Sequence, residues 1–158
     1  MHEGIAIRHA RPEDMERVSS LSAPFVEAGQ LVDRSLAQLG KAVDEFIVAS
    51  HGGRLVGCAG TVPAGKSLLV YNLCIATEWQ GRGVGRRLVE VAMGVGRSQG
   101  YRSVLAVSRY GGEWFEGLGF SRVIPSETRK EWRSLFRPGR NSGLYQLNLA
   151  AEHGKGPK

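Results

Sequence analysis

The chain has 158 residues, of which 42% are hydrophobic and 23% charged, a composition typical of a globular protein with one core. No apolar run approaches the ~20 residues that a membrane-spanning helix needs, and the charged amino terminus predicts no signal peptide. The formal net charge of +6 fits a solvated basic surface, a nucleic-acid-binding face or a pocket for a small polyanion, but the scattered lysines and arginines argue against nucleic acid.

The first half of the chain predicts four strands and two helices. Apolar and polar residues alternate over residues 4–9, as in a strand. A helix begins at Arg11-Pro12 and is expected to end at Pro24, and Ser35 is expected to cap a second, short helix. Further strands are predicted at residues 45–50, 55–62 and 67–75, with a glycine hairpin at 51–54.

The second half alternates helices and strands. A turn over 76–83 leads into an amphipathic helix at 84–100, followed by a buried strand at 103–107 and a short helix at 113–118. A strand at 120–124, a polar helix at 125–135 and a last strand at 144–149 complete the pattern. We therefore predict one α+β domain over residues 1–150, with a mixed, mainly antiparallel sheet and a disordered tail at 151–158.

The sharpest motif is the glycine turn Gln80-Gly81-Arg82-Gly83-Val84-Gly85, between a strand and a helix. Glycines let backbone N–H groups approach a ligand closely, and the helix start adds unpaired donors and a positive dipole end. Arg86 and Arg87 add positive charge next to it. The turn therefore predicts a pyrophosphate seat, with a simple tight turn as the alternative.

Cysteine and histidine usage argues against a metal site. Cys58 and Cys74 lie in strand-like apolar runs, which predicts buried thiols in a reducing cytoplasm. The four histidines show no ligand spacing. We expect no metal.

Two motifs resemble the signatures of the GNAT superfamily of N-acetyltransferases. Gln80 to Gly85 is similar to its Gln/Arg-x-x-Gly-x-Gly/Ala motif, and Trp114-Phe115-Glu116-Gly117-Leu118-Gly119-Phe120 is similar to its short helix ending in Gly-Phe. The predicted order of elements fits as well, so the resemblance covers nearly the whole chain. It implies a GNAT fold and acetyl-CoA as the co-substrate, used in a direct transfer to an amine.

The resemblance also implies how acetyl-CoA is held. Backbone groups of one central strand should bind the pantetheine arm like an added strand, and an N–H there should polarise the thioester carbonyl. That strand should splay away from residues 105–107. The implied cofactor-binding residues are Leu73, Cys74, Ile75, Gln80, Gly81, Arg82, Gly83, Val84, Gly85, Arg86 and Phe115.

A narrower resemblance points to the acceptor. Residues 29–39 resemble the Gly-x-Leu-x-x-Arg-Ser-x-x-x-Leu stretch of bacterial N-acetylglutamate synthases, and residues 125–142 resemble the end of that domain. It implies glutamate as acceptor, in arginine biosynthesis, and arginines suit its two carboxylates. The implied substrate-binding residues are Arg34, Ser35, Tyr71, Asn72, Arg109 and Arg140. For Arg34-Ser35, a helix cap with a solvated charge is an equal alternative.

The chain departs from the family at its acid and base. The usual glutamate base aligns with Leu69, and the usual tyrosine acid aligns with Phe115. Glu113, or a water held by Tyr71 and Asn72, is a candidate base, although an acid at a helix start is the simpler interpretation of Glu113. Tyr110 or bulk water is the candidate acid. Cys74 is a candidate nucleophile, with a buried structural thiol as the favoured alternative.

Four functions therefore compete. The first is acetylation of a small amino acid, glutamate first; the second is a GNAT enzyme for another amine or a protein N-terminus. The missing glutamate and tyrosine also permit an acetyl-CoA-binding domain without turnover. A basic nucleic-acid module is the fourth. The resemblance further suggests a homodimer, and the cysteine usage suggests a cytoplasmic location.

Overall fold

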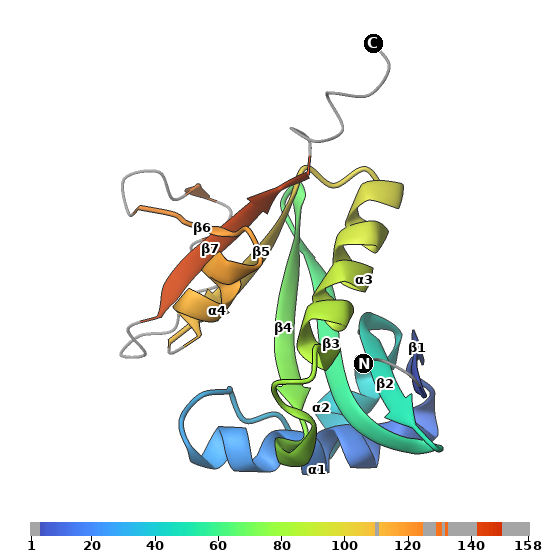
Figure 1. Cartoon of the computed structure of the whole chain (residues 1–158). Coiled ribbons are helices and arrows are strands. Elements are labelled where there is room, and N and C mark those ends of the chain that lie inside the picture. Colours follow the sequence, from blue (N-terminus) through green and yellow to red (C-terminus); the bar gives the residue numbers. More distant parts are fainter. Residues whose placement is uncertain (1–3, 110, 125–128, 131, 133–141, 150–158) are drawn as a thin grey trace. The chain divides into compact units, whose positions relative to one another are not determined.

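The computed structural model describes residues 4–109, 111–124, 129, 130, 132 and 142–149. The chain divides into two compact units: Met1–Thr61 with Asn72–Glu90, and Val62–Tyr71 with Val91–Lys158. Among the described residues the strands hydrogen-bond in the order β1-β2-β3-β4-β5-β7-β6 (Figure 1). The fold is α+β with a mixed, mainly antiparallel sheet, as the sequence predicts.

The first unit contains an antiparallel set of strands. β1 (Ile5–His9) pairs with β2 (Phe46–His51), which pairs with the start of β3 (Arg54–Ala64). Gly52 and Gly53 have φ angles of 59° and 84°, because the two-residue turn between β2 and β3 needs positive φ at both positions. The hairpin predicted at residues 51–54 is therefore confirmed.

Two helices precede β2. α1 (Met15–Glu27) buries Met15, Val18, Leu21 and Ser22 at helical spacing, and α2 (Leu36–Lys41) is followed by a 3-10 turn at Val43–Glu45. The prediction that Pro24 ends the helix is wrong, since α1 continues for about one more turn. A proline in the last turn removes only its own N–H, and the Pro24 carbonyl still accepts from Ala28 N at 3.0 Å.

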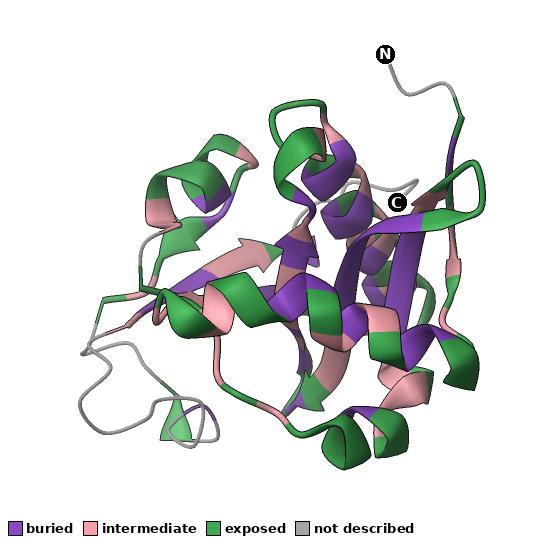
Figure 2. Ribbon diagram, turned by 90° about the horizontal axis from the view of Figure 1, so that it is seen from below, coloured by how far each residue is buried: buried purple, intermediate pink, exposed green. Residues whose placement is uncertain are grey.

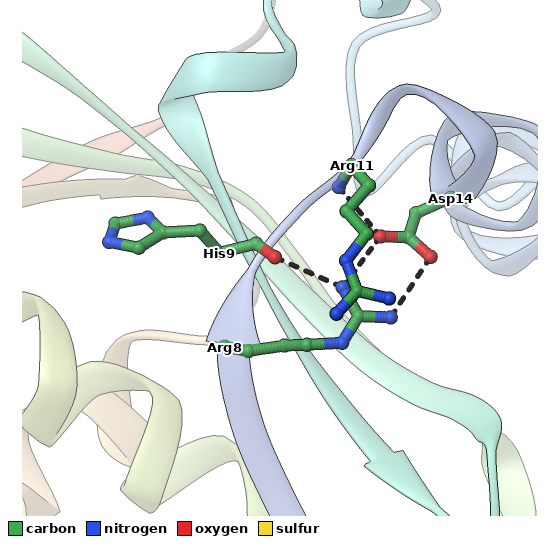
Figure 3. A network of polar contacts seen from close by, with 4 residues as sticks. All are labelled: Arg8, His9, Arg11 and Asp14. Atoms are coloured by element: carbon green, nitrogen blue, oxygen red, sulfur yellow. Dashed lines mark hydrogen bonds and ion pairs between the residues drawn. The ribbon is translucent and has the colours of Figure 1, made fainter.

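Asp14 fixes the start of α1 (Figure 3). A 3-10 turn, Pro12–Asp14, leads into the helix. The Asp14 carboxylate accepts from Arg8 Nη1 at 2.8 Å, Arg8 Nη2 at 3.1 Å and Arg11 N at 2.7 Å. The hydrogen bond from Arg8 lowers the pKa of Asp14 despite its burial. An acid at the helix start is thus paired and buried rather than solvated.

The described residues of the second unit contain one parallel pair of strands and two antiparallel pairs. The first half of β4 (Ser67–Ile75) runs parallel to β5 (Ser103–Ser108), and β5 pairs with β7 (Gly143–Asn148), which pairs with β6. The strand predicted at 120–124 is shorter than expected, because β6 is Ser121–Arg122. The helix predicted at 125–135 lies mostly outside the described residues.

Two more helices complete the described chain. α3 (Val84–Ser98) follows the glycine turn and a 3-10 turn at Thr77–Trp79, and α4 (Gly112–Gly117) contacts β6 and β7 (Figure 1). The helices show buried residues on one side and exposed ones on the other (Figure 2). In the second unit a buried cluster of Ala64, Leu105, Trp132 and Leu144 forms part of the core.

Candidate functional site

The glycine turn has the backbone that a phosphate seat needs. Gly81 and Gly83 have φ angles of 77° and 87°, and Gln80 closes the turn from its start by donating from Nε2 to Ile75 O at 3.0 Å. The first helical hydrogen bond runs from Arg87 N to Gly83 O at 3.1 Å. The N–H groups of residues 84–86 therefore precede the hydrogen-bonded part of α3 and point out of its start.

The arginines near this turn have different roles. Arg82 lies over the Trp79 ring at 4.6 Å, which positions its charge beside the glycines. Exposed Arg86 forms a 3.7 Å ion pair with Glu90 one helical turn later. Arg87 instead donates to Ile5 O of β1 at 3.3 Å, so we assign it to packing rather than to the turn.

Just before this turn, β4 carries a backbone irregularity at Asn72. Asn72 has a φ of 51°, the left-handed region, and it is the one non-glycine residue with positive φ in the described chain. Asparagine tolerates this conformation better than most residues. Asn72 immediately precedes Leu73, where the pantetheine strand is predicted to begin.

The buried Asn72 side chain connects α1 with the segment before α2. Its Nδ2 donates to Ser22 Oγ at 2.8 Å, and its Oδ1 accepts from Arg34 Nη1 at 3.3 Å. Arg34 Nη1 also donates to Val32 O at 3.3 Å. Ser22 in turn donates to Val18 O at 2.7 Å. Hydrogen bonds to Val32 O and Asn72 Oδ1 therefore hold Arg34 in place, so it is more than a solvated charge.

A pocket of about 270 Å³ lies within this first unit, beside Asn72. It is open to solvent on one side, and both polar and charged groups contribute to its wall. Arg34, Glu27 and Asp33 are the charged residues of its lining. The remaining lining residues are Ser19, Ser22, Ala23, Val26, Val32, Leu39 and Asn72. Such a pocket suits a small ligand that carries charges of both signs.

Cys58 and Cys74 adjoin the same network. Each Sγ lies 3.6 Å from the Asn72 carbonyl oxygen, and Cys74 Sγ lies 3.6 Å from Ser22 Oγ. Their mutual hydrogen bond lowers the pKa of Cys74, helped by Ser22 and Arg34, and together with burial raises the pKa of Cys58. The thiols are buried as predicted, but their surroundings are polar and not purely apolar.

The central part of the chain matches a known protein family. The model of the acetyltransferase (GNAT) domain matches residues 42–122, which include β2 to β6, the glycine turn and α4. The chain belongs to the GNAT family.

Individual relatives agree with that assignment. The GNAT chain is 32% identical over 151 residues to an amino-acid acetyltransferase of Neisseria meningitidis, with 92% of this chain and 34% of that protein covered. It superposes on the N-acetylglutamate synthase of Neisseria gonorrhoeae, solved with coenzyme A and N-acetyl-glutamate, with a TM-score of 0.86, 30% identity, and 92% and 35% coverage. The chain thus spans about a third of the length of these relatives.

A more distant structure shows that the fold also occurs in chains of similar extent. A Mycobacterium tuberculosis protein matches with a TM-score of 0.78 and 20% identity, covering 90% of the GNAT chain and 98% of that chain. At this identity the likeness concerns the fold alone.

The family's Gly-Phe signature has a structural reason in this GNAT chain. α4 ends in a Schellman motif: Phe120 N donates to Phe115 O at 3.1 Å, and Gly119 N donates to Glu116 O at 3.0 Å. Gly119 takes the required positive φ, 104°. The Phe115 and Phe120 rings meet at 5.4 Å, the apolar contact that accompanies this motif.

The remaining predicted site residues of the second unit fall in several environments. Phe115 is buried among aromatic rings, including Trp114 at 5.0 Å, and Glu113 is exposed in the first turn of α4. Arg109 is exposed and Tyr71 half-buried, and both have partners. Tyr110 and Arg140 lie outside the described residues. The predicted splay of Leu73–Ile75 away from residues 105–107 involves residues of both units and stays a prediction.

Leu69 and Ser35 have clear local roles. Leu69, at the family's glutamate position, packs against the cluster of Ala64, Leu105, Trp132 and Leu144, so a hydrophobic contact replaces a carboxylate there. The Ser35 hydroxyl accepts from Gln38 N at 3.0 Å, and Gln38 Oε1 accepts from Ser35 N at 2.7 Å. This capping box confirms the predicted helix cap and engages the hydroxyl.

Ser22 and the other pocket residues of α1 were not predicted from the sequence. Ser22 lies seven residues after Met15, on the buried stripe of the helix with Val18. A serine among apolar residues on such a stripe is a detectable signal for a buried polar contact. Trp79 was likewise not predicted to stack on Arg82.

The described residues contain neither a membrane-spanning helix nor a metal-binding cluster. Across the part of the chain that the structure describes, every helix is too short or too polar to cross a membrane. The same part of the chain holds no group of three or more His, Cys, Asp or Glu side chains arranged to bind a metal ion.

Proposed function

We propose that the chain transfers the acetyl group of acetyl-CoA to the amino group of a small amino acid, with glutamate as the leading acceptor. The proposal rests on Arg34, which lines the pocket beside Asn72 and donates from Nη1 to Asn72 Oδ1 at 3.3 Å. A guanidinium binds carboxylates through paired hydrogen bonds. Asn72 directly precedes the strand Leu73–Ile75 that the family uses for its thioester substrate, so the pocket adjoins that strand in the first unit.

The glycine turn supports acetyl-CoA as the co-substrate. In the proposed complex, the N–H groups of residues 84–86 bind the pyrophosphate, and Arg82, placed by Trp79, adds charge. Leu73–Ile75 contribute backbone hydrogen bonds to the pantetheine arm. The relatives from Neisseria include one solved with coenzyme A, which agrees with this assignment.

The chemistry requires three contributions from the chain. The acceptor amine must be neutral and placed against the thioester carbon, so that a C–N bond forms as the C–S bond breaks. A backbone N–H of Leu73–Ile75 stabilises the oxyanion. A base takes the ammonium proton and the leaving thiolate gains one. With Leu69 at the usual base position, we propose that water takes the ammonium proton and protonates the leaving thiolate, and Glu113 and Tyr110 stay predicted candidates for these steps.

The acidic residues of the pocket favour a second candidate. Glu27 and Asp33 line the same pocket as Arg34. Carboxylates suit a cationic acceptor such as a polyamine, whereas a mixed lining suits a zwitterionic amino acid. A GNAT enzyme for a basic amine is therefore the alternative that the pocket supports.

A thiol-release assay tests the proposal. Purified protein receives acetyl-CoA and a panel of amino acids and polyamines, and free CoA is followed over time. We expect glutamate to give the largest release, and Arg34→Ala to raise the acceptor KM by roughly 10–100-fold with a smaller effect on kcat. The matched control is Arg54→Gln, an exposed arginine of β3 outside the pocket.

Three outcomes separate the alternatives. Release with polyamines but not with glutamate supports the basic-amine candidate. Glutamate turnover with an unchanged KM in Arg34→Ala removes Arg34 from the acceptor site. No release with any amine, while acetyl-CoA still raises the melting temperature, would leave a binding domain without turnover.

A further inference from the structure

A second cavity lies in the other unit and shares no residue with the pocket beside Asn72. Its volume is about 40 Å³, and it lies where β4 and β5 begin. Three of its lining residues are basic and three are neutral and polar, and none of the six is acidic. They are Lys66, Arg102, Arg129, Ser67, Ser103 and Gln146.

A buried serine pair forms part of its wall. Ser67 and Ser103 are direct partners in the parallel register, with 4% and 2% of their surfaces exposed. Their Oγ atoms lie 2.6 Å apart, and Gln146 Nε2 donates to Ser103 Oγ at 3.1 Å. In a hydrogen bond between two hydroxyls, one donates its proton and the other accepts with its oxygen. Whichever serine donates, the other O–H is left to donate to a further acceptor.

Two of the three basic residues, Lys66 and Arg102, are brought together by the same register. Lys66 and Arg102 each precede one serine of the pair, and Arg102 N donates to Lys66 O at 2.9 Å. Arg129 lies 5.6 Å from the Trp132 ring, which favours a fixed guanidinium. Three cations around one small cavity repel one another, and a bound anion would convert that repulsion into attraction.

We propose that this cavity binds a tetrahedral oxyanion, a phosphate or sulfate group. The three basic residues neutralise its charge, and the O–H of the accepting serine and the Gln146 amide offer hydrogen bonds to its oxygens. A cavity of about 40 Å³ accepts one such group or a few waters and is too small for a nucleotide. The group is either a free ion or the phosphate of a monoester whose remainder lies outside the cavity.

Nuclear magnetic resonance on the ¹⁵N-labelled full chain tests the proposal. Inorganic phosphate is titrated at constant ionic strength, and the readouts are the backbone amides of Ser67 and Ser103 and the side-chain amide of Gln146. These signals are separate from residues 81–86, where phosphate would also bind if the glycine turn holds a pyrophosphate. Failure of either site is therefore visible independently of the other.

Variants identify the groups that bind the anion. We expect Lys66→Gln/Arg102→Gln to raise the phosphate dissociation constant at least about tenfold, and Ser67→Ala/Ser103→Ala to raise it at least about threefold. The serine variant removes both partners of the serine–serine hydrogen bond together, and the half-buried Gln146 amide that loses its Ser103 acceptor can turn to water, so the variant should still fold. Lys41→Gln/Arg54→Gln removes two exposed charges elsewhere and should leave the constant unchanged.

Titration with different anions distinguishes a free phosphate or sulfate ion from the phosphate group of a monoester. Tighter binding of inorganic phosphate or sulfate supports a free-ion site, and equal or tighter binding of glycerol phosphate supports a monoester. Acetate binding as tight as phosphate would overturn the tetrahedral assignment. The proposal also fails if phosphate shifts only the signals of residues 81–86, or if Lys66→Gln/Arg102→Gln titrates like the unmodified chain.

Discussion

Arg34 Nη1 and Asn72 Oδ1 lie 3.3 Å apart, although 38 residues separate them in the chain. The contact joins the segment before α2 to the irregular point of β4. Arg34 lines the pocket, and its Nη1 donates both to the Asn72 amide oxygen and to Val32 O. We therefore expect the orientation of the proposed carboxylate-binding group to depend in part on Asn72. Asn72 is thus a positioning residue for Arg34.

Substitution of Asn72 tests that relationship. Asn72→Gly permits the φ of 51° but removes the contacts to Arg34 and Ser22. Asn72→Ala removes the same contacts and adds strain, so we expect it to be less stable than the glycine variant by about 1 kcal/mol. Both should raise the acceptor KM while changing kcat less. Urea unfolding and steady-state kinetics measure the two effects.

Comparison of the two variants separates backbone strain from lost contacts. If the glycine and alanine variants unfold at the same urea concentration, the left-handed conformation costs nothing and the strain argument fails. If both keep the normal acceptor KM, Asn72 does not position Arg34. Ser22→Ala is the companion variant, because it removes the other partner of the Asn72 amide from α1.

The glycine turn gives a second prediction. Gly81 has free space where a side-chain methyl group would lie but a φ of 77°, so Gly81→Ala should cost about 1–2 kcal/mol through backbone strain alone. We expect coenzyme A binding to weaken at least about tenfold, because the turn must change shape. Isothermal titration calorimetry measures the binding, and thermal unfolding measures the strain.

Gly94 provides the matched control. It lies in α3 with no atom within 4 Å of an added methyl group, and it has an ordinary helical φ. Gly94→Ala should stabilise the protein by about 0.5–1 kcal/mol and leave coenzyme A binding unchanged. Normal coenzyme A binding by Gly81→Ala would contradict the phosphate assignment of the turn.

Cys74 gives a third prediction. Direct transfer needs no covalent acetyl-cysteine, so Cys74→Ala should keep turnover within about tenfold of the unmodified enzyme. The lowered pKa of Cys74 depends first on the Cys58 hydrogen bond, so Cys58→Ala should move the pH dependence of Cys74 alkylation upward. Loss of turnover in Cys74→Ala, together with an acetylated Cys74 peptide by mass spectrometry, would support a covalent route instead.

Asp14 gives a pH-dependent prediction. Its folded pKa is lowered below the unfolded value of about 3.9, first by the Arg8 hydrogen bond. The resulting stabilisation is complete above the unfolded value and is lost as the pH falls through the folded pKa. Asp14→Asn should therefore cost about 1–3 kcal/mol at pH 7, and the difference from the unmodified chain should narrow toward pH 3. Urea unfolding across this range measures it.

Glu13→Gln is the control for Asp14. Glu13 is exposed in the same 3-10 turn, so its substitution should have little effect at either pH. A stability difference for Asp14→Asn that stays constant down to pH 3 would show that the carboxylate charge is not what stabilises the helix start.

Features that depend on neighbouring residues were predictable from the amino-acid order alone. A few adjacent residues specify local backbone geometry. The features of this kind are the hairpin glycines Gly52 and Gly53, the Ser35 cap, the glycine turn and the Gly119-Phe120 ending of α4. The family was predicted from the glycine turn and the helix ending in Gly119-Phe120, and the α+β fold from the order of the predicted elements. The end of α1 was not, because one proline near a helix end costs only one hydrogen bond.

Contacts between side chains far apart in the sequence could not be predicted and became visible in the folded chain. The Asn72 side chain contacts three residues from other segments, Ser22 of α1, Arg34 before α2 and Cys58 of β3. The register of β4 on β5 likewise placed Ser67 against Ser103. Strand pairing and helix packing set these contacts, and neither is encoded in the spacing of residues along one segment.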